Sequence, residues 1–280
     1  MQDSSKDPKI AGLPPYGGNG MSAIARIGSI TRISSIISLS AILLSCGGGG
    51  GPQTLDLSGT GGPPPEPANP GGIWLGTLTS SGTIINIEGV ITEDSEGRFV
   101  DENGTQYVVT GIGGSGNIRG VNFDAYAQDG FQFLDGSTIA FGNITGTVVE
   151  RSTFSGGFSF STGESGAFSM AYDPIYDRDS SLNKLSGSWD EGFGVMTVDP
   201  DGSFFEQDQF GCIYNGQVSI IDAMFNAYRL TMTVSNCGLD NGDYDGIGVL
   251  ADLTVDGDEN LFIVQMNSLD LIFTSFLERL

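Results

Sequence analysis

The chain has 280 residues, of which 44 are glycine, 34 are acidic, 11 are basic and none is histidine. A formal net charge of −23 at pH 7 disfavours binding to nucleic acid and to anionic headgroups. The absence of histidine excludes the commonest general base, the Ser-His-Asp relay and every histidine-ligated metal site. The length allows one or two domains with a sizeable core.

Residues 21–45 have the features of an export signal. Two arginines precede an apolar run over residues 33–44 (ISSIISLSAILL), which is too short to span a bilayer comfortably because a spanning helix takes about 20 residues. Residues 1–20 contain Asp3 and Asp7, are rich in proline and glycine, and stand ahead of a second methionine, Met21. We predict that residues 1–20 are a non-native extension and that translation starts at Met21.

The signal ends in Leu43-Leu44-Ser45-Cys46, which resembles the lipobox of bacterial lipoproteins. In that family the cysteine sulfur is lipidated, the signal is cut directly before the cysteine, and the new N-terminus usually receives a further chain such as palmitate. The resemblance implies cleavage between Ser45 and Cys46 and a membrane-bound protein held by acyl chains on Cys46. Because Gly47 follows the cysteine in place of an aspartate, it also implies the outer membrane, on the periplasmic face or at the cell surface.

Residues 46–72 carry no hydrophobic periodicity. They contain a run of glycines and then a proline-rich stretch, so we predict a tether between the lipid anchor and the folded part. From Cys46 onward, 7 basic residues stand against 32 acidic ones, a net charge of −25. Such a surface favours solubility and repels nucleic acid.

From Ile73 onward, short runs rich in Val, Ile, Thr, Phe and Tyr recur between glycine-containing turns, which is typical of an antiparallel meander in a sandwich or barrel. Residues 212–220 and 228–234 alternate regularly. We expect the following side chains to point inward: Cys212, Tyr214, Gly216, Val218, Ile220, Tyr228, Leu230, Met232 and Val234. One dry and one wet face is what a closed or two-layer antiparallel sheet requires.

An internal repeat predicts two modules. Residues 89–99 match residues 194–204 at six of eleven positions with an offset of 105, and the two tryptophans both stand in Gly-x-Trp, ending at Trp74 and Trp189. A third match joins residues 144–149 to residues 244–249. The interpretation is an all-β chain with two tandem β-barrel modules over 73–177 and 178–280, each with seven or eight short strands.

The start of the second module, residues 180–189 (SSLNKLSGSW), resembles the start of lipocalin-type barrels, in which a short helical turn precedes Gly-x-Trp and plugs one end of the barrel. Streptavidin-type and other small bacterial lipoprotein barrels also begin with Gly-x-Trp. The resemblance implies a barrel but no particular ligand. Since about 100 residues per module are too few for a deep cup, we expect each barrel to be filled by its own side chains, with Trp74 and Trp189 in the cores.

Cys212 and Cys237 predict a disulfide, because a cysteine pair outside the cytoplasm is most simply bridged. Closing a loop of this length stabilises a fold by roughly 3 kcal/mol. Cys212 falls on the inward face, whereas Cys237 has the parity of the outward threonines. The prediction therefore requires a bulge or a strand end near residues 236–238.

Two further patterns are weaker. Asn241, Asp243, Asp245 and Asp252 overlap the calcium-loop pattern, but no flanking helices are expected and residues 246–252 are typical of a strand, so a hairpin turn is preferred and no metal or cofactor is expected. Tyr172, Tyr176 and Arg178 lie between the modules. They form either a candidate binding patch or a linker whose tyrosines pack across the seam between modules.

No catalytic constellation stands out. The Ser-x-x-Lys at residues 181–184 lacks the S-D-N and K-T-G elements of the penicillin-binding enzymes. We expect a lipid-anchored envelope lipoprotein without enzymatic activity, which binds an envelope protein or glycan or has a structural role. One alternative is a polysaccharide hydrolase that uses paired Asp/Glu about 5–9.5 Å apart. Another is a barrel inserted in the membrane, which would need strands of about 9–11 residues with aromatic girdles.

Overall fold

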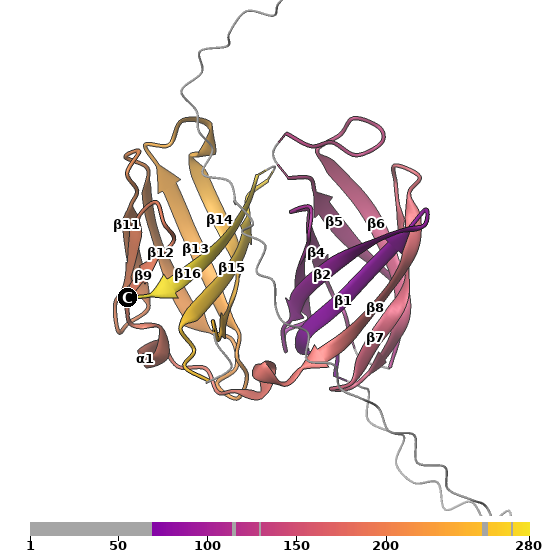
Figure 1. The fold of residues 1–280 in the computed structure, drawn as a ribbon, viewed down its shortest axis with the longest axis horizontal. Coiled ribbons are helices and arrows are strands. Elements are labelled where there is room, and N and C mark those ends of the chain that lie inside the picture. The colour runs from indigo at the N-terminus through magenta and orange to yellow at the C-terminus, as the bar shows by residue number, and fades with distance from the viewer. Residues whose placement is uncertain (1–68, 114–115, 129, 254–256, 270) are drawn as a thin grey trace, which may run out of the picture.

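The computed structural model describes residues 69–113, 116–128, 130–253, 257–269 and 271–280. Over these residues the chain is all-β, and it forms two closed antiparallel barrels of eight strands each, which lie side by side (Figure 1). The predicted fold class is confirmed. The predictions for the signal, for cleavage after Ser45 and for lipidation of Cys46 lie outside the described residues.

Each barrel is a simple meander in which every strand pairs with the next and the last pairs with the first. The first barrel contains β1 (Gly72–Ser80), β2 (Thr83–Ile91), β3 (Glu96–Asp101), β4 (Gln106–Thr110), β5 (Asn117–Tyr126), β6 (Ile139–Val149), β7 (Thr153–Phe160) and β8 (Ser165–Asp173). The second contains β9 (Gly187–Asp190), β10 (Val195–Val198), β11 (Ser203–Gln207), β12 (Ile213–Ile220), β13 (Tyr228–Ser235), β14 (Gly242–Ala251), β15 (Leu261–Asn267) and β16 (Ile272–Arg279).

Three short helical turns complete the fold. The 3₁₀ turn η1 (Pro174–Asp177) and the helix α1 (Leu182–Leu185) connect the barrels, and η2 (Gly238–Asp240) lies between β13 and β14. Ser181 caps α1 by accepting a hydrogen bond from the Asn183 amide. The side chain of Leu185 is fully buried in the second core. The short plug predicted ahead of the second Gly-x-Trp is therefore present.

The two tryptophans occupy equivalent places. Trp74 and Trp189 are fully buried, and each indole N–H donates to the carbonyl oxygen four residues earlier, that of Pro70 (3.0 Å) and that of Leu185 (2.7 Å). An indole buried in a core needs such an acceptor. We call this end of each barrel the tryptophan end and the opposite end the mouth end.

A second repeated motif, Asp-x-x-Gly-x-x-Tyr, joins β3 to β4 and β11 to β12. Asp101 accepts hydrogen bonds from the amides two and four residues later and from the hydroxyl of Tyr107. Asp208 accepts the corresponding three bonds, the last from Tyr214. In both turns the glycine has a positive φ, +81° at Gly104 and +90° at Gly211, which an L side chain adopts only with strain.

The spacing of this motif corrects the sequence alignment of the modules. Asp101 and Asp208 are 107 residues apart, as are Tyr107 and Tyr214. The β2–β3 and β10–β11 hairpins agree, since Thr92 and Asp199 each donate to the carbonyl four residues later. The offset of 105 predicted for residues 89–99 is wrong by two residues. The two alignments have the same pattern of inward and outward residues, because a shift of two keeps every side chain on the same face of the sheet.

The predicted alternation holds along β13, where Tyr228, Leu230, Met232 and Val234 are all buried. On β12, however, Ile220 is exposed, because the strand ends there at the turn that leads to β13. The strand break needed for the disulfide is present as well. β13 ends at Ser235, and Asn236 has a φ of +59°, which resets the side-chain direction ahead of Cys237.

A buried arginine joins the two barrels. Arg98 on β3 donates to the carboxylate of Asp245 on β14 (Nη2–Oδ2 2.7 Å) and to the side chain of Asn267 on β15. Asn267 in turn donates to the hydroxyl of Tyr126 at the mouth end of β5 (3.3 Å). Since Tyr126 ends β5 and Asn267 ends β15, the two mouth ends lie on the same side of the molecule (Figure 1).

The interface continues toward the tryptophan ends. Arg229 on β13 donates to Asp94 and to Glu96, each at 2.7 Å. Burial acts to raise the pKa of Asp94, but the hydrogen bonds from Thr92 and Arg229 hold it below its ordinary value. An apolar cluster lies beside these pairs, and its buried members are Ile73, Val90, Tyr176, Ala227 and Ile247. Such a mixed interface holds the barrels in a fixed arrangement.

Candidate functional site

The interior of the first barrel is closed at its tryptophan end and hollow above it. The indole of Trp74 is fully buried there and packs edge-on against Phe154 (ring centroids 5.7 Å apart) and Tyr172 (5.6 Å). Above this layer lies a cavity of about 50 Å³. Its lining is Leu78, Ile87, Phe99, Tyr107, Val109, Phe123, Ile144, Phe154, Phe158, Phe168 and Met170.

Inward-facing glycines make room for the aromatic rings of this lining. A Cβ atom on Gly142 would lie 2.1 Å from the ring of Phe123, and one on Gly166 would lie 2.7 Å from the ring of Phe158. A Cβ atom on Gly156 would lie 2.0 Å from the carbonyl oxygen of Thr145. The glycines of β6, β7 and β8 therefore let large rings lie against bare backbone.

The mouth of this barrel is a cluster of aromatic rings. Phe160 contacts Phe123 (5.2 Å between centroids), Phe158 (5.6 Å) and Phe133 (5.6 Å), the last from the β5–β6 loop. Tyr107 joins the cluster through Phe123 (6.1 Å). Apart from the phenol of Tyr107, the side chains that line the cavity itself are apolar.

A buried polar pair lies at this mouth. The Tyr107 hydroxyl donates to Asp101 Oδ2 at 2.7 Å. Burial raises the pKa of Asp101, and burial together with the neighbouring Asp101 carboxylate raises the pKa of Tyr107 well above its ordinary value. The pair is structural, because it belongs to the turn motif that both barrels share.

The second barrel is different inside. Its core is packed with large side chains, and at the mouth end Glu206 on β11 points inward, 4% exposed and in hydrogen-bond contact with Glu191. Ser275 Oγ donates to Glu191 Oε2 at 2.7 Å. Burial, and then the Glu191 charge, raise the pKa of Glu206 to about 9. At neutral pH the protonated Glu206 can donate to Glu191, and this pairing explains how an acid survives in the core.

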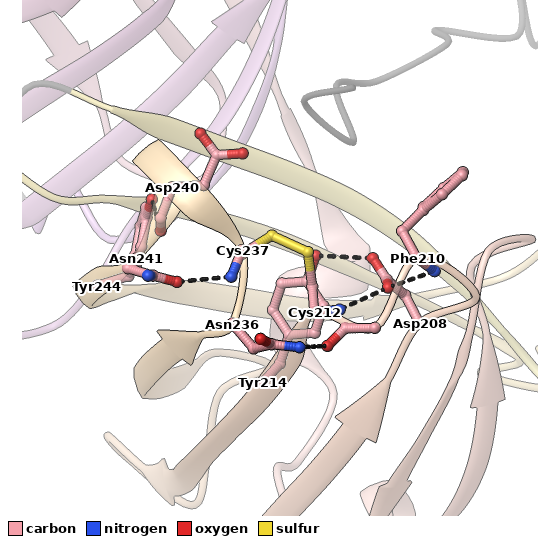
Figure 2. The surroundings of a disulfide bond; sticks show 10 residues. Asp208, Phe210, Cys212, Tyr214, Asn236, Cys237, Asp240, Asn241 and Tyr244 are labelled. Atoms are coloured by element: carbon pink, nitrogen blue, oxygen red, sulfur yellow. Dashed lines mark hydrogen bonds between the residues drawn. A yellow bond between two sulfur atoms is a disulfide. The ribbon is translucent and has the colours of Figure 1, made fainter. Parts of the chain in front are cut away.

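The disulfide lies beside the carboxylate of Asp208 at the mouth end of the second barrel (Figure 2). Cys212 and Cys237 are bonded, with 4.7 Å between their Cα atoms, so the predicted pairing is present. Asp208 fixes one side of the bridge by accepting from the amides of Phe210 (2.8 Å) and Cys212 (2.9 Å). On the other side Asn241 accepts from the amide of Cys237 (2.7 Å).

The candidate patch of Tyr172, Tyr176 and Arg178 belongs to the seam between the barrels. Tyr176 is only 1% exposed and stacks on Phe225 of the second barrel (5.2 Å, 14° between planes). Arg178 makes a bidentate ion pair with Asp252 (2.9 and 2.7 Å). Of the two interpretations left open by the sequence, packing across the seam fits the geometry of Tyr176, while the side chains of Tyr172 and Arg178 are partly exposed.

The four residues of the calcium pattern are spread along the second barrel. Asp243 and Asp245 point outward from β14, where they accept from Thr233 (2.7 Å) and from Arg98 (2.7 Å). Asp252, beyond the end of the strand, binds Arg178, while Asn241 accepts a hydrogen bond from the Cys237 amide in the disulfide loop. Within the described ranges, no group of three or more acidic or cysteine side chains is placed to hold a metal ion.

Sequence reasoning missed the hollow interior and the Glu206 pair. The alternation of glycine and phenylalanine along β7 and β8 was a usable signal, since small and large residues alternate on the inward face of a small barrel. The Asp-x-x-Gly-x-x-Tyr repeat would also have placed Glu206 on an inward position.

Comparison with protein-family models, with curated proteins and with solved structures found no match to this chain. Over the part of the chain that the structure describes, no helix has the length and hydrophobicity needed to cross a membrane.

Proposed function

We propose that the protein is a lipid-anchored protein of the outer membrane whose first barrel binds the narrow end of an apolar ligand such as an acyl chain. One observation carries the binding half of this proposal: the first barrel has a hollow apolar interior behind an aromatic mouth. The lipobox-like segment ending at Cys46 supports the anchoring half.

The dimensions of the cavity restrict the ligand. About 50 Å³ is less than twice the volume of a water molecule in the liquid, so only the end of a slender group fits behind the mouth. Each methylene group buried there is worth about 0.8 kcal/mol. The remainder of the ligand would rest on the ring of Phe160 and its neighbours, where polar atoms can reach water.

The second barrel is not proposed as a binding barrel for the same ligand. The strand pairing makes Phe99 of the first barrel equivalent to Glu206 of the second, and Phe168 equivalent to Ser275. Two hydrocarbon contacts of the cavity are thus replaced by polar groups. An acyl chain would have to lie against a buried carboxyl group, which is unfavourable.

The binding half is tested on the chain from residue 46 onward carrying Cys46→Ser, which we call the unlipidated chain. It retains every residue of both described cores. The neutral fluorophore N-phenyl-1-naphthylamine should brighten on binding, and dodecanoate should displace it. Val109→Phe fills the cavity and should abolish the signal, whereas the matched Val195→Phe, on the outer face of β10, should leave it unchanged.

A second variant guards against misfolding of Val109→Phe, since overpacking costs about 1–3 kcal/mol. Met170→Ala enlarges the same cavity and should admit branched chains that the unchanged protein excludes. Equal binding by all four proteins would disprove an interior site. The anchoring half is tested separately, by metabolic labelling with an alkyne palmitate, which should label the full chain and not its Cys46→Ser variant.

The hydrolase alternative gains no support from the buried carboxyl pair. Glu191 and Glu206 are in hydrogen-bond contact, whereas glycoside hydrolases place their two carboxyl groups at least about 5 Å apart. Such a contact leaves no room for a sugar ring or a water molecule between them.

A further inference from the structure

Large apolar side chains stand at the tips of the loops around the mouth ends of both barrels. Leu239 is 96% exposed, Leu269 92%, Leu134 78% and Phe131 62%. Phe193 and Phe210, on adjacent loops of the second barrel, are also exposed, and their rings lie 6.2 Å apart. We call these six residues the apolar tips.

The apolar tips belong to one end of the molecule. Every loop concerned joins strands at a mouth end: β5–β6 in the first barrel, and β9–β10, β11–β12, β13–β14 and β15–β16 in the second. The contacts of Tyr126 with Asn267 and of Gln106 with the Phe273 carbonyl oxygen (3.0 Å) hold the two mouth ends side by side. The connection through η1 and α1 lies at the opposite end (Figure 1).

We propose that the apolar tips insert into the surface of a zwitterionic lipid bilayer, so that the mouth of the first barrel faces the membrane. A single exposed leucine is ordinary, but six large apolar tips on five loops at one end indicate a binding surface. By contrast, the described loops at the tryptophan ends carry two large apolar side chains that are similarly exposed, Met224 and Leu253.

A bilayer fits this surface better than a protein does. The tips stand on separate loops with acidic residues such as Asp135 and Asp240 next to them, so they do not form one continuous patch. A fluid bilayer can receive each tip separately. The strongly negative chain is repelled by anionic headgroups, and therefore the lipid we infer is zwitterionic.

The position of the proposed anchor is compatible with this orientation. Gly72, where β1 begins at the tryptophan end, comes 26 residues after Cys46. At about 3.3 Å per residue this segment can span roughly 85 Å, more than twice the roughly 36 Å of the longest strand, β6. An anchor at Cys46 thus allows the mouth ends to reach the same membrane. This step rests on the proposed function, whereas insertion of the tips does not.

The test is sedimentation of the unlipidated chain with phosphatidylcholine vesicles, which removes the contribution of acyl chains. The chain should sediment with these vesicles and less with phosphatidylserine vesicles. A Leu239→Ser, Leu269→Ser double variant should weaken binding about tenfold or more, because the two most exposed tips are lost. The matched control, Met224→Ser with Val149→Ser, changes exposed side chains away from the mouth and should bind normally.

Three outcomes would overturn the proposal: no sedimentation with either vesicle, equal binding by the leucine double variant, or a dimer in lipid-free ultracentrifugation that the same double variant abolishes without any vesicle binding. The last result would assign the tips to a second copy of the chain. Val109→Phe should bind vesicles normally, so failure of ligand binding inside the first barrel is distinguishable from failure of membrane insertion.

Discussion

Replacement of Glu206 by glutamine should make the second barrel more stable at neutral pH. The carboxyl group is 4% exposed, touches Glu191, and has a pKa raised from its ordinary 4.5 to about 9 by burial and by that neighbour. The folded protein therefore keeps a proton that the unfolded chain releases above pH 4.5. Stability is lost as the pH rises from about 4.5 toward 9, because over that interval the native state binds more protons than the unfolded state.

The size of the effect follows from the two pKa values. Keeping the proton costs about 1.4 kcal/mol per pH unit between them, so stability should fall by roughly 3 kcal/mol between pH 5 and pH 7.5. Glu206→Gln retains the shape of the side chain and a donor for Glu191, and it cannot ionise. It should remove this pH dependence and gain roughly 4 kcal/mol over the unchanged protein at pH 7.5, because that pH lies three units above the ordinary pKa of 4.5.

The assay is urea unfolding of the unlipidated chain at pH 5 and pH 7.5, followed by tryptophan fluorescence, since each barrel contains one tryptophan. Glu278→Gln on the exposed face of β16 removes the same charge without touching the core, and it should leave the pH dependence intact. Asp101 also has a raised pKa, but it contributes equally to all three proteins. If Glu206→Gln keeps the full slope, the buried carboxyl group is ionised at neutral pH and the reasoning is wrong.

Three further predictions concern stability. Replacing Cys212 and Cys237 together by serine should lower the free energy of unfolding in urea by roughly 3 kcal/mol. If the unchanged protein has the same urea midpoint under reducing and oxidising conditions, the bridge does not constrain the chain. Arg98→Met should lower the free energy of unfolding by roughly 2 kcal/mol. This is less than the 3–5 kcal/mol of a fully buried pair, because the carboxylate of one partner, Asp245, is exposed. The variant should also separate the unfolding of the two barrels in calorimetry, and one unchanged cooperative transition would contradict this role of Arg98. Gly156→Ala should lower the free energy of unfolding by about 2–3 kcal/mol, because its Cβ would meet a carbonyl oxygen at 2.0 Å. The matched control Gly157→Ala should cost less, since its Cβ would lie 3.3 Å from the nearest atom. Equal losses in the two variants would argue that the backbones do not approach closely at Gly156.

Local sequence patterns predicted the parts of the fold that depend on neighbours along the chain. Alternation placed Tyr228 and Leu230 inside, because successive side chains of a strand point to opposite faces. Gly-x-Trp located the tryptophan end of each barrel, and the two cysteines that flank adjacent strands predicted the bridge. The failure at Ile220 has a local cause as well, since alternation does not reveal where a strand ends.

The candidate site depends on closure of the sheet into a barrel, and no single segment of the sequence determines this closure. Whether Phe99 faces Phe168 across a hollow, or Glu206 meets Glu191, is decided by the register of strands far apart in the chain, and a shift of one residue would turn every side chain to the other face. The same holds for Arg98, which looks like an outward, solvated residue until the second barrel covers it. The sequence by itself determined two β modules and their tryptophan-capped ends, while the tertiary structure alone decided that the first core keeps a small apolar cavity, that the second buries a carboxyl pair, and that both mouth ends lie on the same side.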